Sequence, residues 1–147
     1  MIVKQTSNLE EVKSILIDPD IYARITEDGA PESIDYIVPK NAIYIVDGKS
    51  RALMIYHWLS DWCLQCHVQV IPRHRSIAYD FGQAALKWAW DNTEAVKIVA
   101  QIPEIYEDVL KFAEKSGFIL EGINERSYVK NGNIYAQVYL GLCRPEV

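Results

Sequence analysis

A cluster of basic residues lies near the middle of the chain, directly after an apolar segment. Arg73, His74 and Arg75 follow Pro72, and an amphipathic helix is predicted to begin at Ser76. The N-terminus of a helix presents backbone N–H groups and the positive end of the helix dipole, so it attracts phosphate groups. Two arginines and a histidine beside that terminus strengthen the prediction of a pyrophosphate site.

The segment before this cluster carries a row of polar side chains. Residues 62–71 are predicted to form a β-strand, in which alternate residues point to opposite faces. One face then carries Cys63, Gln65, His67 and Gln69, and the other face is apolar. A polar row is unusual on a central strand, because such strands are normally covered on both sides. The row therefore marks His67 as a candidate functional residue.

Two cysteines and a histidine in this strand match the Cys-x-x-Cys-His pattern of c-type haem attachment: Cys63, Cys66 and His67. Haem attachment requires export, and the first residues of the chain show no signal peptide. The two thiols could also offer zinc ligands, but residues three apart in a strand point to opposite faces. We therefore expect two ordinary strand cysteines and no metal site.

The composition indicates one globular domain over residues 1–147. The formal net charge of −5 argues against broad nucleic-acid binding, which requires a basic surface. No apolar run approaches the roughly 18 residues of a membrane-spanning helix. Three cysteines without an export signal favour reduced thiols in the cytoplasm.

Hydrophobic periodicity and turn residues predict the elements that position these side chains. Asp47-Gly48 and Asn131-Gly132 are hairpin signals. Ser7 and Glu10 form a capping-box pattern, and Pro103 is expected to open the last helix. Helices are expected after Ser7, Pro19, Ser76 and Pro103, and strands at residues 2–5, 42–46, 51–59, 62–71, 96–100, 118–128 and 134–142.

Three local features accompany this order of elements. The first is a strand ending in Val70-Ile71-Pro72, followed by Arg75. The second is a helix that ends with Lys115-Ser116 and enters a strand through Gly117-Phe118. The third is a tail containing Glu121-Gly122, Arg126, Gly132 and Leu142-Cys143-Arg144. Together they resemble the GNAT acetyltransferase family over essentially the whole chain, and the tail is similar to that of the ribosomal-protein N-terminal acetyltransferase branch.

The resemblance implies an α+β fold with three layers (α/β/α), in which helices flank a mixed, mostly antiparallel sheet. This is the GNAT-like acyl-CoA N-acyltransferase fold. The resemblance also implies that acetyl-CoA is the cosubstrate and that Val70 and Ile71 hold its pantetheine arm. Its diphosphate would be held by Arg73, Arg75 and the N–H groups of Ser76, Ile77 and Ala78.

The chain departs from the family pattern in its phosphate loop and on its last helix. The family places glycines in the loop, because bare N–H groups must approach phosphate oxygens closely. Here Ser76, Ala78 and Asp80 stand at those positions. The carboxylate of Asp80 would repel a diphosphate, or it is simply a first-turn acid that stabilises its own helix. The family's asparagine and tyrosine on the last helix align with Tyr106 and Ala113.

The polar row borders the cleft in which the family brings amine and thioester together. The resemblance therefore makes His67 a candidate base that takes a proton from the attacking amine, since the unperturbed pKa of histidine is about 6.5. The alternative is a structural histidine that is hydrogen-bonded within the fold.

Two functions stay open. The first is an N-acetyltransferase that transfers an acetyl group from acetyl-CoA to a primary amine of a small molecule or peptide. The second is a catalytically silent GNAT-fold binding or assembly protein, for example phage-encoded, with a decayed CoA loop and a protein partner. The acids between Glu27 and Asp35 would favour a cationic acceptor, unless they are merely solvated. The long final hairpin offers an edge for a homodimer.

Overall fold

The structure is a computed structural model that describes residues 1–31 and 38–146. Within these residues, seven strands form one mixed sheet in the order β1-β2-β3-β4-β5-β7-β6. Neighbouring strands are antiparallel except for β4 and β5, which are parallel. The strands are β1 (Lys4–Thr6), β2 (Ile43–Val46), β3 (Ala52–Trp58), β4 (Cys63–Val70), β5 (Lys97–Pro103), β6 (Ile119–Lys130) and β7 (Asn133–Cys143).

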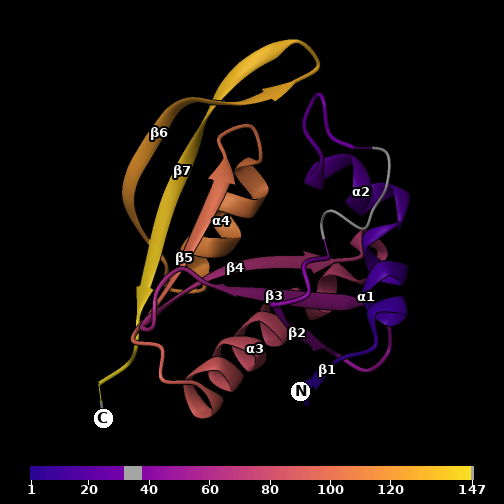
Figure 1. Cartoon of the computed structure of the whole chain (residues 1–147), viewed down its shortest axis with the longest axis vertical. Helices are drawn as coiled ribbons and strands as arrows, with labels where there is room; N and C mark the ends of the chain where they lie inside the picture. The colour runs from indigo at the N-terminus through magenta and orange to yellow at the C-terminus, as the bar shows by residue number, and fades with distance from the viewer. Residues whose placement is uncertain (32–37, 147) are drawn as a thin grey trace.

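Helices cover both faces of this sheet and produce the three layers that the sequence predicts (Figure 1). The α1 and α2 side is held by one apolar cluster, and the α3 and α4 side by another. This arrangement confirms the α+β class, with helices on both sides of a mixed, mostly antiparallel sheet. The helices are α1 (Leu9–Leu16), α2 (Pro19–Ile25), the 3-10 helix η2 (Pro72–Ile77), α3 (Ala78–Asn92) and α4 (Glu107–Lys115).

The alternation of side chains along β3 explains how one sheet serves two cores. Leu53 and Ile55 join the cluster beneath α1, whereas Met54 and Tyr56 join the cluster beneath α3. Tyr56 is fully buried, and its hydroxyl donates a 2.8 Å hydrogen bond to the carbonyl of Ala85 in α3. This bond satisfies the one polar atom that the ring carries into the core.

Two predicted helix starts are wrong. Asn8, rather than Ser7, caps α1, because its side chain accepts the N–H groups of Glu10 and Glu11. Pro103 does not open the last helix: it is the final residue of β5 and is paired with Gln137 of β7. A proline is tolerated there because the strand ends at that residue.

The final hairpin turns where the sequence predicts. Asn131 and Gly132 have φ values of 53° and 77°, as a two-residue turn between antiparallel strands requires. The hairpin is long and reaches past the rest of the sheet toward α2 (Figure 1).

Candidate functional site

The two parallel strands β4 and β5 separate part way along their length (Figure 1). Their pairing covers only Cys63–Gln65 with Lys97–Val99, although β4 continues to Val70 and β5 to Pro103. Beyond this short ladder the two strands leave a V-shaped opening in the middle of the sheet.

Backbone groups of β4 face this opening. The N–H of Ile71 donates to the carbonyl of Arg51, next to β3. Because successive backbone groups of a strand alternate between its two edges, the N–H groups of Val70 and Val68 point the other way. These N–H groups therefore line the opening. Among the described residues, the pairing of β4 with β5 ends before it reaches them, so it gives them no partner.

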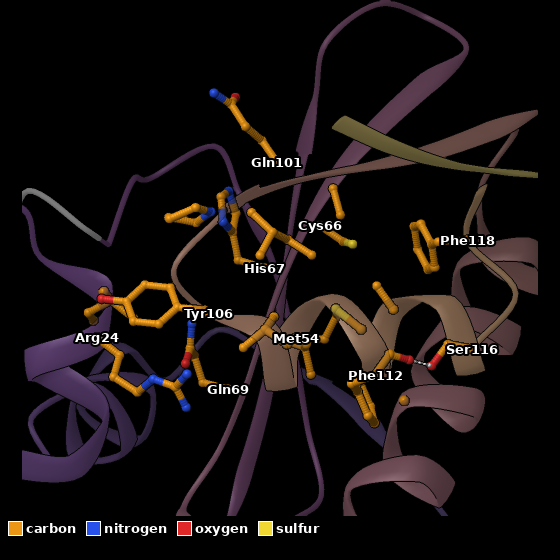
Figure 2. Close-up of a pocket in the computed structure, with 18 of the residues that line it drawn as sticks. Arg24, Met54, Cys66, His67, Gln69, Gln101, Tyr106, Phe112, Ser116 and Phe118 are labelled. Carbon is orange, nitrogen blue, oxygen red and sulfur yellow. Dashed lines mark hydrogen bonds between the residues drawn. The ribbon is translucent and has the colours of Figure 1, made fainter. Parts of the chain in front are cut away.

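A cavity of about 280 Å³ extends from the opening toward α3 and α4. Figure 2 shows Arg24, Gln69 and Tyr106 gathered at one end of it, and Phe112 and Phe118 at the other. Its remaining lining is mainly apolar and comes from both strands and both helices: Met54, Cys66, Val68, Leu86, Ala100, Ile102, Val109 and Ala113. An extended, largely apolar chain fits such a space.

The basic segment after β4 forms a 3-10 helix, η2, before α3 begins. The helix predicted to begin at Ser76 begins at Ala78 instead, because residues 72–77 form the 3-10 helix, and no side chain caps α3. The N–H of Ala78 donates to the carbonyl of Arg75, so this amide, which the resemblance assigned to the diphosphate, is already used. Asp80 is exposed in the first turn of α3, where a carboxylate stabilises the helix dipole.

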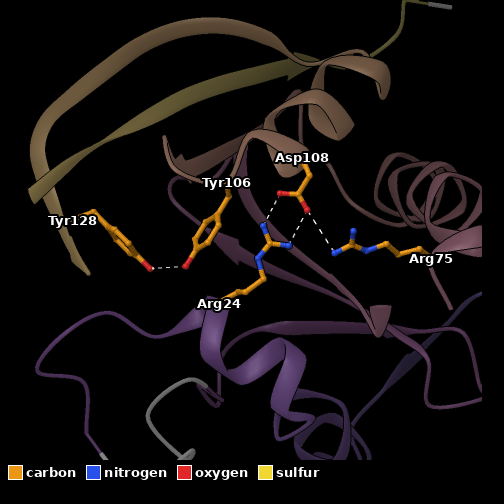
Figure 3. Close-up of polar contacts among 5 residues, drawn as sticks. All are labelled: Arg24, Arg75, Tyr106, Asp108 and Tyr128. Atoms are coloured by element: carbon orange, nitrogen blue, oxygen red, sulfur yellow. Dashed lines mark hydrogen bonds and ion pairs between the residues drawn. The ribbon is translucent and has the colours of Figure 1, made fainter. Parts of the chain in front are cut away.

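The arginines of the basic segment are paired with carboxylates. Arg73 lies 3.0 Å from Asp18, and Arg75 lies 3.6 Å from Asp108. Asp108 also accepts two hydrogen bonds from Arg24 of α2, at 2.8 and 2.5 Å (Figure 3). This single carboxylate of α4 therefore joins α2 to η2, next to the cavity-lining residue Arg24. The Arg24 hydrogen bonds, together with the charges of Arg24 and Arg75, lower the pKa of Asp108 to about 2.

The lowered pKa of Asp108 gives an expected pH dependence of stability. A carboxyl whose pKa is lower in the folded protein stabilises the fold above its ordinary value of about 3.9. That contribution is lost as the pH falls toward 2. We expect Asp108→Asn to weaken the fall in the free energy of unfolding between pH 4 and pH 2, measured by urea denaturation. If the free energy of unfolding decreases equally in both proteins, the ion pair between Arg24 and Asp108 does not stabilise the fold in solution.

Tyr106 is a site residue that sequence reasoning placed only as an alignment position. It precedes α4, lines the cavity and lies beneath Arg24, whose Cζ atom is 4.6 Å from the ring centroid. Its hydroxyl is 3.4 Å from the hydroxyl of Tyr128 on β6 (Figure 3). Burial and this contact raise the pKa of Tyr128. The phenol of Tyr128 therefore stays protonated at neutral pH and can donate a hydrogen bond.

His67 lies where the opening meets the α1–α2 side of the sheet. Its ring packs edge-on against that of His57 on β3, with centroids 5.2 Å apart. Burial, with a smaller contribution from His57, lowers the pKa of His67 to about 4, and burial also lowers the pKa of His57. Among the described residues neither imidazole has a hydrogen-bond partner, so the ring nitrogens remain available to a ligand.

The two cysteines of the Cys-x-x-Cys pattern face different surroundings. Cys66 is buried in the cluster beneath α3, and burial raises its pKa to about 12, so the thiol stays protonated. Cys63 is half-buried, and neither cysteine is in a disulfide. In the part of the chain that the structure describes, no group of three acidic, histidine or cysteine side chains is placed to hold a metal ion.

The acidic segment after α2 binds the final hairpin. Glu27 accepts the N–H of Val129, and Asp28 accepts the N–H groups of Asn131 and Gly132. The rest of this segment, from residue 32 onward, lies outside the described residues. None of the described helices is long and apolar enough to cross a lipid bilayer.

Comparison with known proteins agrees with this geometry at the level of the fold. No protein-family model and no curated protein matches the sequence. Among solved structures, a protein assigned as a phosphinothricin N-acetyltransferase superposes with a TM-score of 0.79 at 16% identity, covering 99% of each chain. Spermidine N-acetyltransferase from Vibrio cholerae, in complex with CoA and spermine, gives 0.77 at 14% identity, covering 97% of this chain and 94% of that one.

A third structure is an acetyltransferase of the GNAT family from Bacillus anthracis. It superposes with a TM-score of 0.70 at 13% identity, covering 97% of this chain and 98% of that one. These identities are low, so the likeness establishes the fold: the chain has the GNAT acyl-CoA N-acyltransferase fold.

Proposed function

We propose that this protein is an N-acetyltransferase that transfers the acetyl group of acetyl-CoA to a primary amine. The observation that carries the proposal is the divergence of β4 and β5 beside an apolar cavity. The opening offers backbone donors from one strand, and the cavity offers the length and apolar lining that a pantetheine arm needs.

The pantetheine arm would lie along β4, where its amide groups can replace the missing strand partner. Val68 and Val70 supply the N–H groups for this pairing, and the amide of Ile71 is already bound to Arg51. The resemblance assigned the contact with the pantetheine arm to Val70 and Ile71. We instead assign this contact to the N–H groups of Val68 and Val70.

The diphosphate would bind at η2, next to Arg73, Arg75 and the amides of Ser76 and Ile77. Ala78 would contribute through the dipole of α3, since its own N–H is bonded to Arg75. An incoming diphosphate competes with Asp108 for Arg75 and with Asp18 for Arg73. The side chains of both arginines are more than half exposed, which leaves them free to turn toward a ligand.

Catalysis would come chiefly from orienting the reactants and polarising the thioester carbonyl. A backbone N–H of β4 that faces the opening would stabilise the oxyanion. The amine nitrogen forms a bond to the carbonyl carbon, and the C–S bond breaks as the thiolate leaves. His67 would accept the proton that the nitrogen loses and pass it to the thiolate.

A His67→Gln variant tests this role. Removal of a general base typically costs about 10²–10⁴-fold in rate, and we expect about 10²-fold here because His67 is only weakly basic. The lowered pKa moves the His67 limb of the rate profile to about pH 4, below the neutral range that the sequence implies. Steady-state rates of thiol release from acetyl-CoA measure both effects. An unaltered rate and profile would leave His67 a structural residue.

The function itself is tested by incubating the protein with acetyl-CoA and a panel of primary amines. Amine-dependent release of free CoA supports the transferase. The tail that resembles the ribosomal-protein N-terminal acetyltransferases makes a peptide α-amine one member of the panel. Absence of release with every amine, together with absence of CoA binding, would contradict the proposal.

The second candidate, a non-catalytic GNAT-fold protein, is favoured by one observation. The segment that should cradle the diphosphate is a closed 3-10 turn without glycine, and its arginines are paired with carboxylates. If that pairing persists when CoA is present in excess, the diphosphate does not bind at η2, and the non-catalytic candidate is favoured over the transferase.

A further inference from the structure

A second cavity adjoins the first on the α1–α2 side of the sheet. Its volume is about 230 Å³. Leu16, Ile25 and Ile55 supply much of its apolar wall, and its polar atoms come from His57, His67 and Gln69. Three residues, Ile25, His67 and Gln69, line both cavities, so the two spaces meet beside the His67 ring. A molecule in the second cavity would face a thioester held in the first.

The described lining of the second cavity carries no negative charge to pair with a cation. No carboxylate is among the described residues that line it. Burial lowers the pKa of both imidazoles, so they are uncharged at neutral pH and neither repel nor attract an ion. An alkylammonium, whose pKa resembles the value of about 10.4 for lysine, would lose its hydration there without gaining an opposite charge from the described lining.

The two described acids that follow the lining residue Ile25 in the chain, Glu27 and Asp28, are occupied elsewhere. Glu27 and Asp28 bind backbone N–H groups of the β6–β7 hairpin, at distances of 2.8 to 3.0 Å. These hydrogen bonds lower the pKa of Asp28, which keeps its carboxylate ionised and bound to the turn. The acids that the sequence offered for a cationic acceptor therefore stabilise the hairpin in the part of the segment that the structure describes.

The size and lining of the second cavity suit a single aromatic ring. An apolar protein cavity of about 150 Å³ accommodates benzene. We propose that the acceptor is an uncharged primary amine on one aromatic ring, bound in the second cavity with its nitrogen beside His67. This inference rests on the proposed acetyl transfer and names the substrate class of the same site.

The chemistry of such an acceptor agrees with the weak basicity of His67. The lone pair of an aromatic amine is delocalised into the ring, so the amine is uncharged at neutral pH. The nitrogen forms a C–N bond with the acetyl carbon, the C–S bond breaks, and the electron pair leaves on sulfur. One N–H proton passes through His67 to that sulfur, giving an aryl acetamide and CoA. Proton transfer is effective here because donor and acceptor are similarly weak bases.

The test uses the full chain with p-toluidine as the aromatic probe and spermidine as the cationic comparator. Histidine ring NMR signals report binding in the presence of CoA, and thiol release from acetyl-CoA reports turnover. We expect p-toluidine to shift the His57 and His67 signals and to give a kcat/KM at least tenfold above that of spermidine. Equal or better use of spermidine would overturn the inference.

A pair of variants locates the binding site. His57→Trp fills the second cavity from β3 and should abolish the p-toluidine response while the CoA-induced change in melting temperature persists. Gln65→Trp is the matched control, because Gln65 lies directly opposite His57 in the β3–β4 register and lines neither cavity. A p-toluidine response that survives in His57→Trp would contradict the site.

Failure of this inference is distinguishable from failure of the proposed function. If CoA does not change the melting temperature of the unmodified protein, the proposed acetyltransferase function itself is contradicted. A normal CoA response without His57 and His67 shifts on addition of p-toluidine would remove only the aromatic acceptor. If CoA binds but no amine is acetylated, the His57 and His67 ring signals still test whether p-toluidine binds in the second cavity. A shift supports the aromatic acceptor, and unshifted signals contradict it.

Discussion

Replacement of Arg75 by glutamate should abolish the stabilisation that CoA confers on this protein. A ligand at about 100 times its Kd stabilises the fold by about 2.7 kcal/mol, which corresponds to a rise in Tm of about 5–10 °C for a chain of this size. A hydrogen bond to a charged group contributes about 1.5–3 kcal/mol, and the new carboxylate would also repel the diphosphate. We therefore expect affinity for CoA to fall at least about 100-fold. Differential scanning fluorimetry across a CoA titration measures this loss of affinity.

The control for this variant is Lys87→Glu. It makes the same charge change on α3, on a side chain that is 75% exposed and lines neither cavity. Its CoA response should match that of the unmodified protein. Arg75→Gln separates loss of the cation from the added repulsion. An Arg75→Glu protein that still responds to CoA would show that the diphosphate binds elsewhere.

Truncation of Leu64 to alanine should destabilise the domain by about 2–5 kcal/mol, the range for buried leucines. Leu64 is fully buried and lies opposite Ile98 in the short ladder that holds β4 and β5 together before they diverge. The cavity left behind would loosen the junction from which the opening starts. At about 2–4 °C per kcal/mol, Tm should fall by roughly 4–20 °C.

Leu59→Ala is the matched comparison, because Leu59 is 57% exposed just past the end of β3. Its effect should stay within about 0.5 kcal/mol, as for most surface changes. Urea denaturation of both variants gives the two free energies. Similar values for Leu64→Ala and Leu59→Ala would show that the ladder is not part of the stable core.

Local pattern was sufficient to predict most of the fold. The alternation of apolar residues in β3 and β4, the Asn131-Gly132 turn and the spacing of Phe81 and Ala85 are each set by neighbours a few residues away. Such signals can be read from the sequence without knowledge of the tertiary structure. They fail at helix ends, where Ser7 and Asn8 are both good caps and only the observed hydrogen bonds distinguish them.

The candidate site was less predictable, because it depends on contacts between distant residues. His67 was found from strand alternation, but its lowered pKa depends on burial and on His57, ten residues away. Arg24, Tyr106 and Asp108 come from α2 and from the start of α4, and no local spacing connects them. A signal for Tyr106 was present in its alignment with the family's asparagine position.

The Asp108 pairing bears on whether the chain is an enzyme or a binding protein. Asp108 holds Arg24 and Arg75 together, so its one carboxylate is shared by two guanidinium groups and one positive charge stays uncompensated at this point. A diphosphate must displace this carboxylate from Arg75 before it can bind. The 3.6 Å pair is exposed on both sides and therefore weak, whereas the Arg24 pair has two close hydrogen bonds. We expect Arg75 to be released first.

An NMR titration with CoA tests the central claim most directly, with ADP as a ligand that carries a diphosphate but no pantetheine arm. If the arm lies between the diverging strands, CoA will shift the backbone amide signals of Val68, Val70 and Gln101, and ADP will shift only signals near Arg75. Identical changes with the two ligands, or none at the two strands, would contradict an acyl-CoA site in this sheet.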